Sequence, residues 1–175
     1  MQKQLLLGVE AIAQGAIDSG ISGVYAYPGT PSTEITEYIQ NSKEAIARNV
    51  HRAWAANEKT AMESALGMSY AGKRDLVCMK HVGLNVAADC FMNAAITGAN
   101  GGLVVTAADD PSMHSSQNEQ DSRVYGKFAF VPVLEARSLR NDPLRFRSLR
   151  NGRFSRIDAD YHPSGPLPCR SRNAR

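Results

Sequence analysis

The sequence predicts an α/β protein in which helices cover both faces of a parallel sheet. Short apolar runs bounded by polar or turn residues have the length of buried strands, and they lie at residues 23–27, 76–79 and 102–108. Segments whose apolar residues recur at helical spacing lie before and between these runs, at residues 7–19, 57–73 and 86–97. Because strands and helices alternate, the strands are expected to run parallel and to be buried on both sides.

Two polar residues mark the expected starts of helices. Ser32 follows a turn rich in Gly and Pro and precedes the apolar positions Ile35 and Ile39, so it is expected to cap a short helix. Asn57 is expected to cap the next helix, whose first turn contains Glu58. A strand followed by a Gly/Pro turn and a capped helix is the repeating unit of an α/β fold.

The remaining segments complete the alternation. Residues 50–54 are expected to open the second unit, and residues 80–85 are predicted as a loop. Residues 109–123 form a polar stretch that is longer than a plain connection, which is typical of a functional loop. Residues 130–135 are predicted as a further strand.

The net charge of +3 conceals a change from an acidic to a basic composition near Glu135. Residues 1–135 contain ten Lys or Arg and fourteen Asp or Glu, whereas residues 136–175 contain ten Arg, three Asp and no Lys. We predict one domain over residues 1–135 and an Arg/Ser/Pro-rich tail over residues 136–175 that is either disordered or translated out of frame. The competing interpretation is a genuine basic extension for an anionic partner; we expect no nucleic-acid partner.

Several classes of protein do not fit this composition. No apolar run approaches the roughly 18 to 20 residues that span a bilayer, and the first residues lack the core of a signal peptide. A cytoplasmic protein without a membrane partner is therefore expected. The three cysteines, Cys78, Cys90 and Cys169, show neither CxxC nor Cys/His spacing, so neither a disulfide framework nor a metal site is predicted.

Polar segments that follow the predicted strands are expected to converge, since ligands of parallel α/β sheets bind beyond the carboxyl ends of the strands. These segments are residues 28–32, 80–85 and 109–123. His81 and His114 within them fit either a ligand contact or a structural role, and Glu58 alone fits a charge at a helix N-terminus. No Gly-rich phosphate loop or nucleophile elbow is present. The residues by themselves predict a polar cleft without naming its ligand.

Four blocks of sequence together resemble a known enzyme family. They are AYPGTPSTEI at 26–35, NEK at 57–59, MKHVGLNVAAD at 79–89 and ADDPSMHSSQNEQDSR at 108–123. In this order they are similar to the N-terminal, pyrimidine-binding domain of the alpha subunit of indolepyruvate:ferredoxin oxidoreductases, within the pyruvate:ferredoxin oxidoreductase group of thiamine diphosphate enzymes. The resemblance covers nearly all of residues 1–135 and implies that they form a partial pyrimidine-binding domain, incomplete at its C-terminal end.

The resemblance implies thiamine diphosphate as the cofactor and assigns roles to particular residues. Glu58 matches the glutamate that hydrogen-bonds N1′ of the aminopyrimidine, so it is the expected catalytic residue. His81 and Asn85 are expected to contact the cofactor with Glu58, and Thr30, His81 and His114 are expected to contact the substrate. The implied reaction is oxidative decarboxylation of a 2-oxoacid, of the indolepyruvate or arylpyruvate type, to an acyl-coenzyme A with electrons passed to ferredoxin.

The resemblance also implies parts that this sequence does not contain. Mg²⁺ with its Gly-Asp-Gly motif and the 4Fe–4S clusters with their cysteines are expected only in other domains. The complete enzyme is expected to pair this domain with a diphosphate-binding domain and a beta subunit, and the chain alone is expected to be inactive. Two alternatives stay open: a non-catalytic pyrimidine-domain module, and the half-subunit of a thiamine-dependent decarboxylase or synthase. The block at 114–123 argues against the decarboxylase or synthase.

Overall fold

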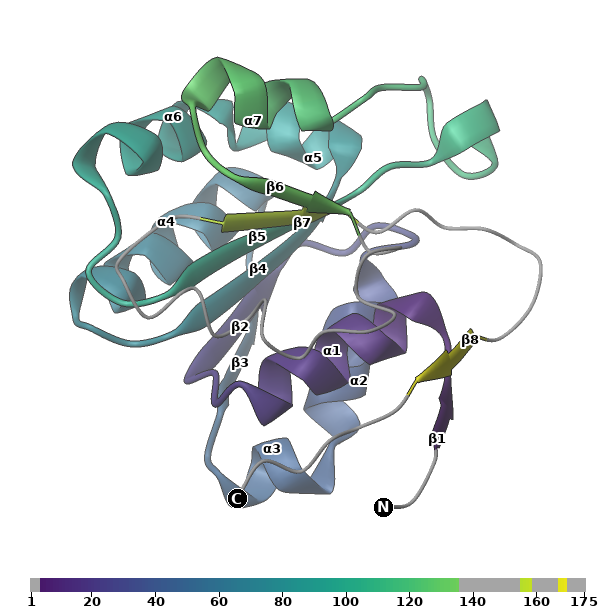
Figure 1. Cartoon of the computed structure of the whole chain (residues 1–175), viewed down its shortest axis with the longest axis vertical. Helices are drawn as coiled ribbons and strands as arrows, with labels where there is room; N and C mark the ends of the chain where they lie inside the picture. Colours follow the sequence, from purple (N-terminus) through teal and green to yellow (C-terminus); the bar gives the residue numbers. More distant parts are fainter. Residues whose placement is uncertain (1–3, 136–154, 159–166, 170–175) are drawn as a thin grey trace.

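A parallel sheet forms the centre of the structure, a computed structural model that describes residues 4–135, 155–158 and 167–169. Within these residues the sheet has six strands in the order β3-β2-β4-β5-β7-β6 (Figure 1). The strands are β2 (Gly23–Ala26), β3 (His51–Trp54), β4 (Asp75–Lys80), β5 (Leu103–Ala108), β6 (Val133–Glu135) and β7 (Ser155–Asp158). A separate antiparallel pair joins β1 (Gln4–Leu6) to β8 (Leu167–Cys169).

Helices cover both faces of the sheet (Figure 1). One face packs against α1 (Gly8–Asp18), α2 (Thr33–Asn41) and α3 (Lys43–Ala47). The other face packs against α4 (Glu58–Tyr70), α5 (His81–Val86), α6 (Ala88–Thr97) and α7 (Arg123–Ala129). Side chains of β4 alternate between the two cores, with Leu76 and Cys78 on one side and Val77 and Met79 on the other. The predicted fold class, a parallel sheet between two helical layers, is confirmed.

The structure corrects two of the predicted segments. Residues 80–85 were expected to be a loop, but α5 begins at His81 and its residues His81, Gly83 and Leu84 are buried. Gly and Asn are weak helix formers, so burial against the sheet overrides local propensity at this helix. The predicted strand at 130–135 begins only at Val133, because α7 ends at Ala129 and the next residue, Phe130, is left-handed with a φ of 55°.

Ser32 precedes α2 as predicted, yet its side chain does not cap the helix. Its backbone is already helical, with a φ of −76° and a ψ of −21°, whereas capping residues usually have an extended backbone. The Ser32 hydroxyl instead donates to the carbonyl of Gly29 at 2.7 Å, and the Thr33 hydroxyl accepts from the Gly29 amide at 2.7 Å. Both contacts tighten the turn that follows β2.

The predicted tail contributes β7 and β8, which are the parts of residues 136–175 that the structure describes. β7 pairs in parallel with both β5 and β6. The remainder of the tail lies outside the described residues, so its disorder or change of reading frame stays a prediction.

Cys78 and Cys90 are free thiols buried on opposite sides of the sheet. Burial raises the pKa of Cys78 to about 12 and the pKa of Cys90 to about 11. Both thiols are therefore protonated at neutral pH and unsuited to nucleophilic chemistry. In the described part of the chain, no helix is long and apolar enough to cross a membrane.

Asp75 is a buried carboxyl group at the amino end of β4. It is 1% exposed, and neither carboxylate oxygen has a hydrogen-bond partner among the described residues. It lies over Gly23 of the neighbouring strand, where an added Cβ would be 2.7 Å from Oδ1. Burial raises the pKa of Asp75 from 3.8 to about 7.

This raised pKa predicts that the fold loses stability as the pH rises from about 4 to about 7. Over that range the unfolded chain ionises Asp75 while the folded chain keeps it protonated, so ionisation favours unfolding. The loss is at most about 4 kcal/mol, since each pKa unit corresponds to about 1.4 kcal/mol. In urea denaturation across this pH range, Asp75→Asn should lack the loss, and Asp18→Asn, at an exposed position of α1, should keep it. Equal pH dependence in the wild type and D75N would contradict this assignment.

Candidate functional site

The carboxyl ends of the central strands lie at one edge of the sheet, as the sequence predicts. Ala26 at the end of β2 is paired with Cys78 of β4, and Lys80 at the end of β4 is paired with Ala108 of β5. The turn after β2, the start of α5 and the loop at residues 109–122 therefore project from the same edge (Figure 1). α4 also begins here, because β3 lies beside β2 and ends at Trp54.

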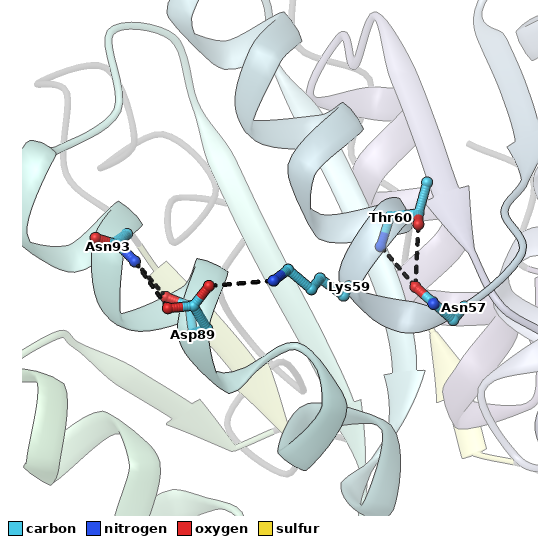
Figure 2. Close-up of polar contacts among 5 residues, drawn as sticks. All are labelled: Asn57, Lys59, Thr60, Asp89 and Asn93. Atoms are coloured by element: carbon cyan, nitrogen blue, oxygen red, sulfur yellow. Dashed lines mark hydrogen bonds and ion pairs between the residues drawn. The ribbon is translucent and has the colours of Figure 1, made fainter.

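Glu58 is the first residue of α4, and the contacts of its neighbours fix this end of the helix. The side-chain oxygen of Asn57 accepts from the amide of Thr60 at 2.8 Å and from its hydroxyl at 3.1 Å, which confirms the predicted cap (Figure 2). Lys59 forms an ion pair with Asp89 of α6, with 3.3 Å between Nζ and Oδ2 (Figure 2). The backbone that carries Glu58 is thus held from both sides.

The Glu58 side chain extends from α4 to α5 and lies against Gly83. A Cβ added at Gly83 would be 2.5 Å from Oε1 and 2.8 Å from Cδ of Glu58, so this approach requires a residue without a side chain. Glu58 is half-buried, and among the described residues its carboxylate has no hydrogen-bond or ion-pair partner. It is therefore available to bond a ligand at the carboxyl edge.

His81 is fully buried at the start of α5, and both ring nitrogens face carbonyl oxygens. Nδ1 lies 3.4 Å from the carbonyl oxygen of Ala108, and Nε2 lies 3.0 Å from the backbone oxygen and 3.2 Å from the side-chain oxygen of Asn118. These contacts connect α5 to β5 and to the loop at residues 109–122. Within this chain His81 braces that loop, while a contact with cofactor or substrate stays a prediction.

Asn85, one turn further along α5, is exposed and joins the same loop through side chains. It exchanges two hydrogen bonds with Gln120, at 2.9 and 3.1 Å, and accepts a third from the hydroxyl of Tyr125 at 2.7 Å. Gln120 also donates to the carbonyl of His81 at 3.3 Å. α5, the loop and α7 are therefore linked beside Gly83.

Thr30 and His114 are exposed on two neighbouring loops, and Ser115 connects them. The Ser115 hydroxyl donates to the carbonyl of Thr30 at 3.3 Å. The carbonyl of Ser115 accepts from Nζ of Lys80 at 2.7 Å. The structure thus brings Thr30 and His114 to one place, while Glu58, His81 and Asn85 form a second group around α5.

Asp110 organises the loop that carries His114, although the sequence analysis did not single it out. It is 3% exposed, and its carboxylate accepts hydrogen bonds from the amide and hydroxyl of Ser115, the hydroxyl of Ser116 and the amide of His114. Burial alone would raise the pKa of Asp110, but these bonds outweigh it and lower the pKa. The Asp-Pro pair, followed by Ser115 and Ser116, is the sequence signal for such a turn.

The same loop contains strained backbone. Ser112 and Met113, in the short helix η1 (Pro111–Met113), have φ values of 67° and 53°, in the left-handed region that non-glycine residues rarely adopt. Such residues cost about 1 to 3 kcal/mol each and persist only where surrounding contacts determine the conformation. The hydrogen bonds to Asp110 supply these contacts on one side, and on the other Glu119 accepts from the amide of Ser112 at 3.3 Å.

Comparisons with known proteins agree with this architecture. No family model matches the chain. The indolepyruvate oxidoreductase subunit IorA of Archaeoglobus fulgidus is 53% identical over 140 residues, which cover 79% of this chain and 22% of that subunit. The IorA subunit of Pyrococcus horikoshii is 53% identical over 138 residues, covering 79% and 21%. That of Methanothermobacter thermautotrophicus is 45% identical over 159 residues, covering 91% and 25%.

A solved structure shows the same fold at low sequence identity. It is the 2-oxoglutarate:ferredoxin oxidoreductase from Magnetococcus marinus with 2-oxoglutarate, coenzyme A and succinyl-CoA bound, with a TM-score of 0.74 at 19% identity over 97% of this chain and 32% of that chain. The chain spans about a fifth to a quarter of the length of the curated relatives it matches. Because about half of the aligned residues are identical over most of the chain, the chain is similar to a fragment of the indolepyruvate oxidoreductase subunit IorA.

Proposed function

We propose that residues 1–135 form the part of a 2-oxoacid:ferredoxin oxidoreductase that activates thiamine diphosphate, with Glu58 as the residue that bonds the cofactor. The observation that carries this proposal is the position of the Glu58 carboxylate. It lies at the carboxyl edge of the sheet, against a glycine and without a partner among the described residues. The 53% sequence identity to IorA subunits over most of the chain supports the same proposal.

The chemistry explains why an unpartnered carboxyl group is needed at this place. Thiamine diphosphate, when bound, supplies a nucleophilic carbon for the keto group of a 2-oxoacid and accepts the electron pair released by decarboxylation. Glu58 bonds the aminopyrimidine at N1′ and shares a proton with that nitrogen. A carboxylate already engaged in an ion pair would serve this role poorly, and Gly83 leaves room beside Oε1 where any other residue would place a Cβ.

The neighbouring polar groups fit contacts to cofactor and substrate. Asn85 lies exposed on the same short helix as Gly83, and we assign it to the cofactor side. His81 is buried on that helix with both ring nitrogens engaged, so we assign it to bracing the loop beside the cofactor and the substrate. Thr30 and His114 lie on loops joined by Ser115, and we assign them to the 2-oxoacid. A hydroxyl and an imidazole are suitable hydrogen-bond partners for the carboxylate and keto oxygens of such a substrate.

The remaining parts of the reaction are assigned to other domains and subunits. Among the described residues, no group of three or more His, Cys, Asp or Glu is placed to hold a metal ion. In this proposal, as the resemblance implies, Mg²⁺, the diphosphate site, the 4Fe–4S clusters and the sites for coenzyme A and ferredoxin belong to a diphosphate-binding domain and a beta subunit. The names of the curated relatives favour indolepyruvate as the 2-oxoacid.

Replacement of Glu58 by Gln tests the proposal directly. Residues 1–135 replace the matching segment of the Archaeoglobus fulgidus relative, and the assembled enzyme is assayed for ferredoxin reduction with indolepyruvate, thiamine diphosphate, Mg²⁺ and coenzyme A. Glu58→Gln should lower kcat roughly a hundredfold or more, because Gln cannot share a proton with N1′. Glu63→Gln, at an exposed position of the same helix, is the matched control.

Three outcomes would count against the proposal. An inactive parent hybrid would favour a non-catalytic module, and decarboxylation without ferredoxin reduction would favour a decarboxylase. Activity of Glu58→Gln within tenfold of the parent would remove Glu58 from the chemistry.

Replacement of Gly83 by Ala should displace Glu58 while sparing the fold. The new Cβ would meet the flexible end of the Glu58 side chain, which can move, so the free energy of unfolding should change by less than about 1 kcal/mol. Activity of the hybrid should fall at least about tenfold, since small displacements of a reacting group are costly. Gly67→Ala in α4 is the control, because nothing lies within 4 Å of its added Cβ. Full activity of G83A would show that the close contact is dispensable.

A further inference from the structure

Ser115 joins its own loop to the turn after β2 and to the last residue of β4. Its hydroxyl donates to the carbonyl of Thr30 after β2, and its own carbonyl accepts from Lys80 at the end of β4. The aliphatic part of Lys80 crosses Gly29, where an added Cβ would be 2.8 Å from Cδ. The position of Thr30 therefore depends on where the loop after β5 holds Ser115.

Asp110 holds Ser115 in turn, and its contacts use both carboxylate oxygens. Oδ2 accepts from the amide of Ser115 at 2.8 Å and from the hydroxyl of Ser116 at 2.7 Å. It also lies 3.4 Å from the Ser115 hydroxyl, whose single proton is shared between Oδ2 and the carbonyl of Thr30. Oδ1 accepts from the amide of His114 at 3.2 Å. Only a group with two acceptor oxygens satisfies this set, because the amide of an Asn would place a donor opposite a donor.

The backbone between Asp110 and His114 needs this support. Ser112 and Met113 both have a positive φ, so the turn is unfavourable in isolation and persists through the contacts made around it. Without the carboxylate of Asp110, the loop would lose the bonds that fix residues 114–116 beside Thr30. Burial of Asp110 to 3% exposure keeps water from replacing those bonds easily.

We propose that Asp110 is a positioning residue, which acts through Ser115 to hold Thr30 and His114 in the arrangement that binds a 2-oxoacid. This inference rests on the proposed function for the identity of the ligand. The network itself involves only residues of this chain and is independent of that identity. A residue with this role should affect substrate binding more than the chemical step.

The first test measures amide hydrogen exchange by NMR in the full 175-residue chain. In Asp110→Asn the amides of His114 and Ser115 should exchange roughly ten- to a hundredfold faster, as expected for loss of a hydrogen bond to a charged group. Exchange in β4 should not change, which shows that the fold is kept. Asp18→Asn removes the charge of an exposed carboxylate that accepts one side-chain bond, and it should leave both loop amides unaffected.

Ser115→Ala tests the contact between Ser115 and Thr30 separately from the contact between Asp110 and the amide of residue 115. The amide of residue 115 keeps its bond to Asp110, so protection of the loop should stay within about threefold of the wild type. The bond to Thr30 is lost, so the NMR signals of Thr30 should move. Unchanged Thr30 signals in both S115A and D110N would overturn the link between the loops.

The second test compares KM with kcat in the hybrid enzyme, with indolepyruvate as the varied substrate. Asp110→Asn should raise KM at least about tenfold with kcat within about threefold, since it weakens contacts made in both ground and transition states. A fall in kcat at unchanged KM would indicate only a smaller folded fraction and would overturn the positioning role.

The two proposals fail in different ways. Equal exchange rates of the loop amides in D110N and the wild type would contradict the positioning role of Asp110, whatever the activity of E58Q. Retained activity of E58Q would remove the proposed chemistry and would leave the exchange result unaffected.

Discussion

The parallel pairing of β4 with β2 and β5 is the constraint on which the rest of the site depends. Its register aligns Ala26 with Cys78 and Lys80 with Ala108, so the segments that follow the three strands emerge side by side. β4 is buried on both faces, and its side chains anchor both hydrophobic cores. A shift of one residue would exchange the faces of Leu76 and Val77 and would separate the loops from one another.

Three acidic residues in and beside the sheet show how the environment decides what a carboxyl group does. Asp75 is buried without a hydrogen-bond donor among the described residues, so its pKa rises. Its ionisation therefore lowers the stability of the fold. Asp110 is almost as buried but accepts four hydrogen bonds, so its pKa falls and it organises a loop. Glu58 is half-buried on a capped helix and has no such partner in the part of the chain that the structure describes, which suits it to a ligand.

The loop at residues 109–122 links the two halves of the candidate site. Asn118 and Gln120 bond to His81 and Asn85 of α5, near the contact between Glu58 and Gly83. At its other end Ser115 reaches Thr30. A displacement of this loop would therefore move both the groups assigned to the cofactor and those assigned to the substrate. The same loop contains the strained residues of η1, so its conformation is held by contacts rather than by local preference.

Periodicity and turn residues in the sequence determined the alternation of strands and helices, the cap at Asn57 and the convergence of the loops, because these features depend on local spacing and on the general behaviour of parallel sheets. The four sequence blocks also indicated the similarity to indolepyruvate oxidoreductase subunits, while the role of Glu58 stays a prediction. Tertiary structure alone decided that residues 81–86 are helical, that Gly83 receives the Glu58 side chain, and that Asp110 holds Ser115. The reason is physical. Each of these features results from burial or from hydrogen bonds between groups whose relative position is set only once the sheet has assembled.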